Sequence, residues 1–224
     1  MKVIITGTTG MVGKGVLLEC LDHPEIEKVL SIGRSKLDLN HDKLEQLIHK
    51  DFADFSSVAD QLKGYDAVYL CMGVSAAGLS EEKYHEMTFE YTLSLAKTLV
   101  DQDKEMTCTY VSGAGTDSSE KGSVMWARVK GKTENALLNL GFKQAFMFRP
   151  GTIIPLRGIR SKTKLYQFFY DYFLWLIRIL KKVSPNSIVN TTQMGLAMIN
   201  ATKMGYPARI LNPRDIIEAS NKKK

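Results

Sequence analysis

The sequence has few of the residues from which metal centres and disulfide frameworks are built. Its 224 residues include three cysteines and four histidines. Cys20, Cys71 and Cys108 have no metal-like spacing and fall within apolar runs, which predicts buried free thiols in a reducing compartment. The histidines are scattered, without the HxxxH or HExxH spacing of a zinc site. We therefore expect no metal.

Two further features are missing. There is no GxSxG motif, which the nucleophile elbow of many hydrolases requires. The first residues, MKVIITGTTG, pass from a strand pattern directly into a glycine loop, without the long apolar run and cleavage site of a secretory signal. We therefore expect a cytoplasmic protein.

The excess of positive charge is confined to one segment. The net charge is +6, and residues 157–182 hold seven Lys or Arg against one acid, so the rest of the chain sums to zero. This concentration, with no nucleic-acid motif, argues against a nucleic-acid partner. The simplest interpretation is a solvated basic face. The alternative is a surface that presents positive charge to an acidic substrate, such as a carboxylate or an acyl-CoA-like molecule.

What the sequence does contain is an alternation of short β-rich runs and longer helical patterns. The short runs occupy residues 2–6, 28–33, 66–73, 106–113 and 144–151, with a weaker one at 44–52. Helical spacing appears at 11–22, 56–62, 80–102 and 123–140. Strands that alternate with helices form parallel βαβ units, and continuously apolar strands fit a sheet covered on both faces. We predict an α/β fold with a doubly wound, mainly parallel, Rossmann-like sheet.

The pattern changes after residue 151. Residues 161–183 form an apolar helical stripe that Asp171 and Arg178 interrupt, too short and too charged to span a bilayer. With a helix at 191–205 and the tail, it predicts a small helical C-terminal cap. Three roles fit its apolar surface: a homodimer interface, a substrate-pocket wall, or contact with a membrane surface, the last being the least favoured.

We accordingly expect a single domain over 1–224. Its dinucleotide-binding core spans 1–155, and 156–224 form the cap and the substrate or interface region.

The stretch ITGTTGMVGKGVLLECL carries the strongest functional signal. Gly7, Gly10 and Gly13 follow the first strand and open a helix. Gly7 permits the tight turn, Gly10 lets the backbone approach a pyrophosphate, and Gly13 lets the helix pack on the sheet. The first-turn N–H groups favour an anion. The predicted dinucleotide-binding residues of this loop are Gly7, Thr9, Gly10, Met11 and Val12.

The end of the second strand indicates which dinucleotide binds. VLSIGRSK places Arg34 and Ser35 where a carboxylate would otherwise bind the adenosine ribose, and no acid occurs before Asp38. An arginine suits a ribose phosphate. We therefore favour NADP(H) over NAD(H); the alternative is that Arg34 is a solvated loop charge.

These residues resemble the short-chain dehydrogenase/reductase superfamily in its extended or atypical branch. TGTTGMVG looks like that branch's cofactor loop, and SIGRS, VSGAG, VKGKTE and RPG look most like the Tat-interacting-protein oxidoreductase-like group. The resemblance covers about residues 1 to 155 well and the remainder loosely.

The resemblance implies further site residues, each of which could equally be a strand end, a buried strand or a turn. Asp51 and Phe52 would flank the adenine, and Ser112 matches the catalytic-serine region, although Gly113 stands where many relatives carry another serine. Cys71, Met72 and Gly73 would line the middle of the cofactor. Pro150, Gly151, Thr152 and Ile153 would lie beside the nicotinamide carboxamide.

The family's YxxxK pair is only half present. Lys130 stands at the lysine position, where it would hold the nicotinamide ribose, but the tyrosine position holds Trp126. An indole N–H donates a hydrogen bond but is no useful acid or base. No tyrosine lies between Tyr110 and Tyr166, so a small shift of register does not restore the motif. Lys132 is a fallback for the lysine.

Two functions remain open. The first is an NADP(H)-binding oxidoreductase that reduces an unidentified small carbonyl substrate, with the proton supplied by Lys130, a water, Ser112 or a tyrosine. The second is a catalytically silent NADP-dependent regulatory or protein-interaction module. Trp126 is either a packing residue or a wall of the nicotinamide pocket. The candidate tyrosines are Tyr84, Tyr91 and Tyr166.

Overall fold

A computed structural model describes residues 1–159 and 187–222 of the chain. The helix predicted over 161–183 lies outside the described residues, and so does the surface on which the homodimer prediction rests. Within the described part, no helix is long and apolar enough to cross a membrane.

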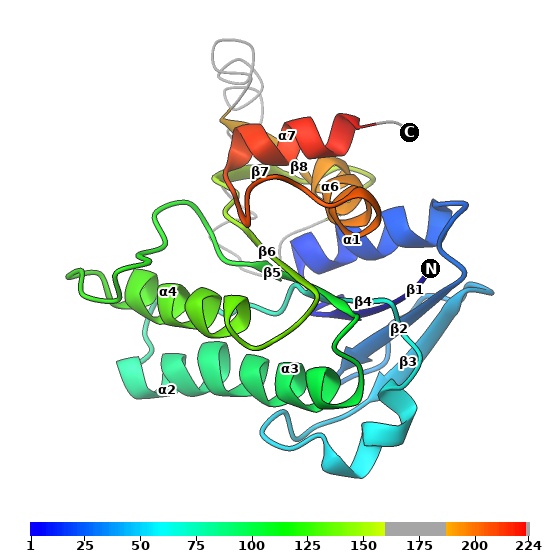
Figure 1. Ribbon diagram of the computed structural model, residues 1–224, viewed down its shortest axis with the longest axis horizontal. Coiled ribbons are helices and arrows are strands. Elements are labelled where there is room, and N and C mark those ends of the chain that lie inside the picture. The colour runs from blue at the N-terminus through cyan, green and yellow to red at the C-terminus, as the bar shows by residue number, and fades with distance from the viewer. Residues whose placement is uncertain (160–186, 223–224) are drawn as a thin grey trace.

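The main sheet has seven parallel strands in the order β3-β2-β1-β4-β5-β6-β9. The chain starts in the middle, moves outwards through β2 and β3, and then returns to the other side of β1 (Figure 1). This reversal creates a switch point between β1 and β4, where a ligand crevice is expected. The strands are β1 (Lys2–Thr6), β2 (Lys28–Gly33), β3 (Leu44–Ile48), β4 (Ala67–Leu70), β5 (Thr107–Val111), β6 (Gln144–Phe148) and β9 (Ile210–Leu211).

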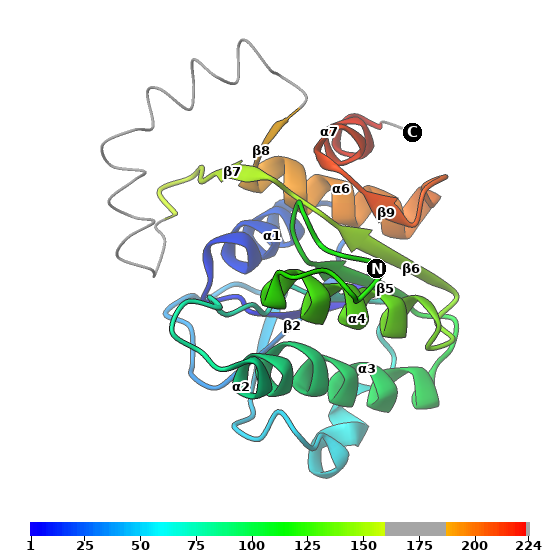
Figure 2. The ribbon, with the colours of Figure 1, turned by 90° about the vertical axis from the view of Figure 1, so that its left-hand side faces the viewer.

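Helices cover both faces of this sheet (Figures 1 and 2). One face carries α1 (Met11–Asp22), α6 (Thr191–Met204) and α7 (Pro213–Asn221). The other carries α2 (Glu81–His85), a π-helical segment (Glu86–Glu90), α3 (Tyr91–Gln102) and α4 (Met125–Leu138). The run at 56–62 is a 3-10 helix, Ser56–Leu62. The doubly wound architecture predicted from the sequence, with its C-terminal helices, is confirmed.

The two hydrophobic cores follow from the alternation of side chains along each strand. In β1, Val3 and Ile5 belong to the cluster under α1 and α6, whereas Ile4 belongs to the cluster under α3. All three are fully buried. Burial on both faces therefore explains why KVIIT shows a continuous apolar run instead of a polar alternation.

Two details of the C-terminal part were not predicted. β9 extends the main sheet beyond β6, and β7 (Thr152–Ile154) pairs with β8 (Ile188–Asn190) in a separate two-stranded parallel sheet. Strands of two or three residues are too short to show a periodic pattern. The predicted strands 66–73, 106–113 and 144–151 end earlier, at Leu70, Val111 and Phe148, because their last residues leave the sheet.

Candidate functional site

The glycine loop between β1 and α1 is built as the sequence predicts. Gly7 has φ +70°, and a Cβ there would lie 2.5 Å from the Cys71 carbonyl oxygen, so conformation and space both require glycine. A Cβ on Gly13 would overlap the Gly7 carbonyl oxygen, which shows how closely α1 starts against the strand end. Gly10 is the N-cap of α1 and supplies no capping side chain, which leaves first-turn N–H groups for an anion.

Two adjoining cavities lie along the carboxyl ends of the strands. One has a volume of about 520 Å³ and the other about 460 Å³. Because they share lining residues, they form one groove across the switch point between β1 and β4. The shared residues are Gly10, Met11, Cys71, Met72, Gly73 and Val74.

We name the smaller cavity the adenosine half. Its lining includes Gly7, Thr9, Arg34, Ser35 and Phe52, five of the residues for which a cofactor contact is expected from the sequence. Asp51 is not among its lining residues: it is exposed, and its carboxylate accepts the Ala53 N–H at 2.9 Å.

The lining residues of the adenosine half that sequence reasoning missed include Lys50, Met87 and Tyr91. Lys50 directly precedes Asp51 and Phe52, which the family resemblance places beside the adenine. Its position in the loop after β3 could therefore have indicated a cofactor contact. Met87 lies in the π-helical segment and Tyr91 at the start of α3, and no pattern in the sequence marks either one.

The larger cavity, which we name the catalytic half, brings together most of the residues implied for the nicotinamide and the reaction. Its lining includes Val12, Ser112, Trp126, Lys130, Pro150, Gly151 and Ile153. Thr152 lies in β7, is exposed and does not line the cavity. The Ala114 N–H donates to the Pro150 carbonyl at 2.8 Å, which joins the loop after β5 to the segment after β6.

Lys130 lines the catalytic half and is held there by the loop after β5. Its Nζ donates a hydrogen bond to the carbonyl oxygen of Ser112. Burial lowers the pKa of this lysine to about 8, although the negative charge of Glu134, one turn further along α4, acts in the opposite direction. Burial therefore makes the Lys130 ammonium group a stronger acid than that of an exposed lysine.

Trp126 lies one turn before Lys130, on the same side of α4 and in the wall of the same cavity. The edge of its ring faces Gly115, where an added Cβ would lie 3.4 Å from Cη2. The indole therefore stands between the loop after β5 and the cavity.

The Ser112 hydroxyl is engaged with the protein interior. It donates to the carboxylate of Glu134 and lies 3.1 Å from the Phe148 carbonyl oxygen. Glu134 is fully buried and forms an ion pair with Arg149. Sequence reasoning did not identify this pair. The available signal was that Glu134 ends VKGKTE and Arg149 begins RPG, two of the motifs quoted for the family resemblance.

The other candidates for proton transfer are not in the catalytic half. Tyr84 is 1 % exposed and does not line the groove. Tyr91 lines the adenosine half and donates to Glu86 at 2.6 Å. Lys132 lies 3.1 Å from the His85 Nε2, outside the cavity. Tyr166 lies outside the described residues.

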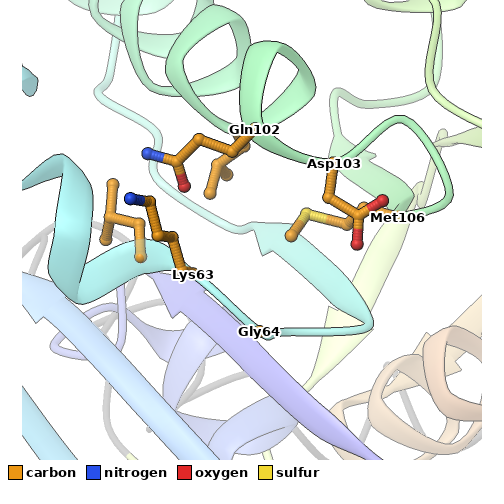
Figure 3. Close-up of a pocket in the computed structure, with 7 residues that line it drawn as sticks. Lys63, Gly64, Gln102, Asp103 and Met106 are labelled. Carbon is orange, nitrogen blue, oxygen red and sulfur yellow. The ribbon is translucent and has the colours of Figure 1, made fainter.

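A third cavity, of about 310 Å³, lies at the amino ends of the strands β4 and β5 (Figure 3). It is lined by Lys63 and Gly64, which precede β4, and by Gln102, Asp103 and Met106, which precede β5. Ligands of doubly wound sheets bind at the carboxyl ends of the strands, so this cavity is separate from the cofactor groove.

The sheet order and the glycine loop define a Rossmann-like α/β protein. The pattern of the NAD dependent epimerase/dehydratase family matches residues 3–122, more than half of the chain. The chain belongs to this family. The resemblance to the short-chain dehydrogenase/reductase superfamily, in its atypical branch, is confirmed by this match and by the relatives below.

Two curated relatives are similar over more than two thirds of the chain. Protein FMP52, mitochondrial, from Saccharomyces cerevisiae is 26% identical over 166 residues, which cover 73% of this chain and 69% of the yeast protein. Protein HTATIP2 from Rattus norvegicus is 27% identical over 158 residues, which cover 68% of this chain and 63% of the rat protein.

The predicted cytoplasmic location is wrong, because several relatives from yeasts and other fungi are named as mitochondrial proteins. The reasoning from sequence tested only for the apolar run of a secretory signal, and mitochondrial targeting does not use such a run.

Solved structures share the fold. An oxidoreductase of the short-chain dehydrogenase/reductase family from Burkholderia thailandensis superposes with a TM-score of 0.70 at 15% identity, over 97% of this chain and 92% of that protein. The carbonyl reductase Sniffer of D. melanogaster gives 0.64 at 15% identity, over 95% and 96%. The Bordetella bronchiseptica enzyme WbmF, in complex with NAD+, gives 0.68 at 13% identity, over 98% and 77%.

Proposed function

We propose that this protein is an NADP(H)-dependent oxidoreductase that reduces a small carbonyl compound, with Trp126 in place of the usual tyrosine. The observation that carries the proposal is the single groove across the switch point. One end holds Arg34 and Lys50, and the other holds Lys130 and Trp126. A dinucleotide needs cations for its phosphates at one end and a reaction chamber at the other.

The charges of the adenosine half support NADP(H) over NAD(H). Arg34 and Lys50 line it, together with the Ser35 hydroxyl, and none of its described lining residues is Asp or Glu. A guanidinium forks onto a ribose phosphate, whereas a carboxylate would repel it. The buried Thr8 and Ser31 hydroxyls, 2.7 Å apart, hold the loop above β1 against β2.

The catalytic half supports a small, weakly polar substrate. Beyond the cofactor loop, its described wall consists mainly of apolar side chains, with Lys130 as the cation among them. The apolar wall residues are Met72, Val74, Val111, Ala114, Trp126, Pro150 and Ile153. An uncharged aldehyde, ketone or quinone fits this wall better than a polyol, whose hydroxyl groups need many partners.

A second candidate is a catalytically silent NADP-dependent regulatory or protein-interaction module. Two observations favour it: the tyrosine position holds Trp126, and the Ser112 hydroxyl is directed to Glu134. Both groups that orient and protonate a substrate oxygen in the family are thereby altered.

One experiment tests the proposal against this alternative. NADPH and NADH are titrated by fluorescence, and NADPH oxidation is then followed over a panel of aldehydes, ketones and quinones. We expect tighter binding of NADPH than of NADH, and turnover of at least one carbonyl. Tight binding without any turnover would favour the regulatory module, and no binding of either cofactor would refute both candidates.

A further inference from the structure

The catalytic half contains few groups that can give up a proton. Its described lining includes two ionisable side chains, Cys71 and Lys130, and two hydroxyl groups, Ser75 and Ser112. A reduced carbonyl becomes an alcohol only if some group delivers a proton to the oxygen. These four side chains are therefore the described candidates.

Three of the four are poor acids in this setting. Burial raises the pKa of the Cys71 thiol to about 12. The Ser112 hydroxyl already donates its hydrogen to the Glu134 carboxylate. Ser75 is an exposed aliphatic alcohol whose oxygen accepts the Ala77 N–H at 3.3 Å. None of these side chains combines a free proton with a pKa near that of the surrounding solution.

Lys130 has the position and the chemistry that the others lack. One of its three N–H bonds is directed to the Ser112 carbonyl, which leaves two donors for groups in the cavity. It lines the cavity one turn along α4 from the indole that stands at the tyrosine position.

We propose that Lys130 is the catalytic acid of this protein and transfers its ammonium proton to the oxygen of the substrate carbonyl. The proposal rests on the proposed function, because it requires the reduced dinucleotide as the source of hydride.

The reaction balances without any further reagent. The reduced nicotinamide, when bound, would supply a hydride (two electrons and one hydrogen nucleus) to the carbonyl carbon as the C=O π bond breaks. The oxygen then takes the proton from the Lys130 Nζ. The products are the alcohol, the oxidised nicotinamide and a neutral amine, which recovers a proton from solvent.

Glu134 is the positioning residue of this arrangement. Its carboxylate binds the Ser112 hydroxyl, and Ser112 in turn presents its carbonyl oxygen to the lysine. Arg149 holds that carboxylate from the end of β6. Among the described residues, Cys71 lines the same cavity and Tyr110 on β5 interacts with the charge of Glu134. Burial raises the pKa of both.

The burial that lowers the pKa of Lys130 to about 8 agrees with this role. A general acid works best when its pKa lies near the working pH. An ordinary lysine, with a pKa of about 10.4, transfers its proton much less readily.

The decisive test compares Lys130→Arg with Lys132→Arg. Arginine keeps the positive charge for cofactor contacts but does not release a proton at neutral pH. Lys132 is the matched control, because it lies two residues further along α4 and contacts His85 outside the cavity. Each variant is assayed for NADPH affinity by fluorescence and for the single-turnover rate with the carbonyl found in the panel.

We expect Lys130→Arg to keep NADPH affinity within about threefold and to lose roughly a hundredfold or more in the single-turnover rate. Lys132→Arg changes neither. The rate of the unaltered protein falls as the pH rises through about 8. In the cofactor-free protein labelled with ¹³Cε-lysine, one NMR resonance, assigned by its loss in Lys130→Arg, titrates with the same midpoint.

Three results would overturn the proposal. The first is an unchanged rate in Lys130→Arg, and the second is a Lys130 resonance that titrates above pH 10. The third is a rate that depends on Tyr166, lost in Tyr166→Phe while Lys130→Arg keeps it. By contrast, a protein that binds no NADPH at all refutes the proposed function itself, and the NMR titration then still reports the state of Lys130.

Discussion

The buried ion pair between Glu134 and Arg149 makes a quantitative prediction about stability. Glu134 has no exposed surface, and the side chain of Arg149 is 15 % exposed. In Arg149→Met, the carboxylate would remain in the interior and would keep, of its hydrogen bonds to Ser112 and Arg149, the one from the Ser112 hydroxyl. Removal of one partner of a buried pair costs about 3–5 kcal/mol. For a chain of this size, that loss lowers the melting temperature by roughly 6–20 °C.

The measurement is thermal and urea denaturation of three proteins: the unaltered chain, Arg149→Met, and the double variant Glu134→Leu/Arg149→Met. The double variant removes the stranded charge, so it should recover most of the lost stability. Glu105→Gln serves as the control, because its ion pair with Lys143 lies on the surface, with side chains 75 % and 57 % exposed. Its loss should be less than about 1 kcal/mol.

Two outcomes would refute this reasoning. One is a loss in Arg149→Met no larger than that of the surface control, which would mean that water reaches the Glu134 carboxylate. The other is a double variant as unstable as Arg149→Met, which would show that the stranded charge is not the cause of the loss.

Three further predictions follow from single residues. Arg34→Asp should weaken NADPH binding by roughly ten- to a hundredfold, which corresponds to the loss of one charge-assisted hydrogen bond, and should leave NADH binding unchanged. Equal losses of affinity for the two cofactors in fluorescence titrations would show that Arg34 does not bind the ribose phosphate. Gly131→Ala should lower the melting temperature, since its Cβ would overlap the Asp117 carbonyl oxygen; an unchanged transition would show that the loop moves freely. Because burial lowers the pKa of Lys130 from 10.5 to about 8, the unfolded chain binds a proton between these values that the folded protein lacks. Denaturation across this pH range should therefore show stability rising with pH relative to Lys130→Met, and a constant difference would contradict the lowered pKa.

Much of the fold was predictable because its signals are local. KVIIT, the glycine loop and the helix that follows are adjacent in the chain, and each shows its own pattern of spacing. β9 could not be predicted in the same way. Its two residues join the main sheet only because β6 offers an unpaired edge, and that edge is a property of the assembled sheet.

Some residues of the candidate site could be predicted from the sequence, and others could not. Residues at strand ends, such as Arg34 and Pro150, were found because the carboxyl ends of parallel strands meet in space. The ion pair of Glu134 with Arg149 was not found, because it joins a helix to a strand end and no spacing rule relates the two. The direction of the Ser112 hydroxyl depends on that pair, and so it could not be predicted from the sequence either.

One line of side chains along α4 becomes more buried from turn to turn, and this has a consequence for how such a protein can change. Trp126, Lys130 and Glu134 follow one another at single-turn intervals, from the half-buried rim of the groove to the fully buried interior. We expect a substitution at the half-buried first position to cost less stability than one at the fully buried third position. The chemistry of the groove can therefore change by substitution of Trp126, while the buried Glu134 preserves the structure of the groove.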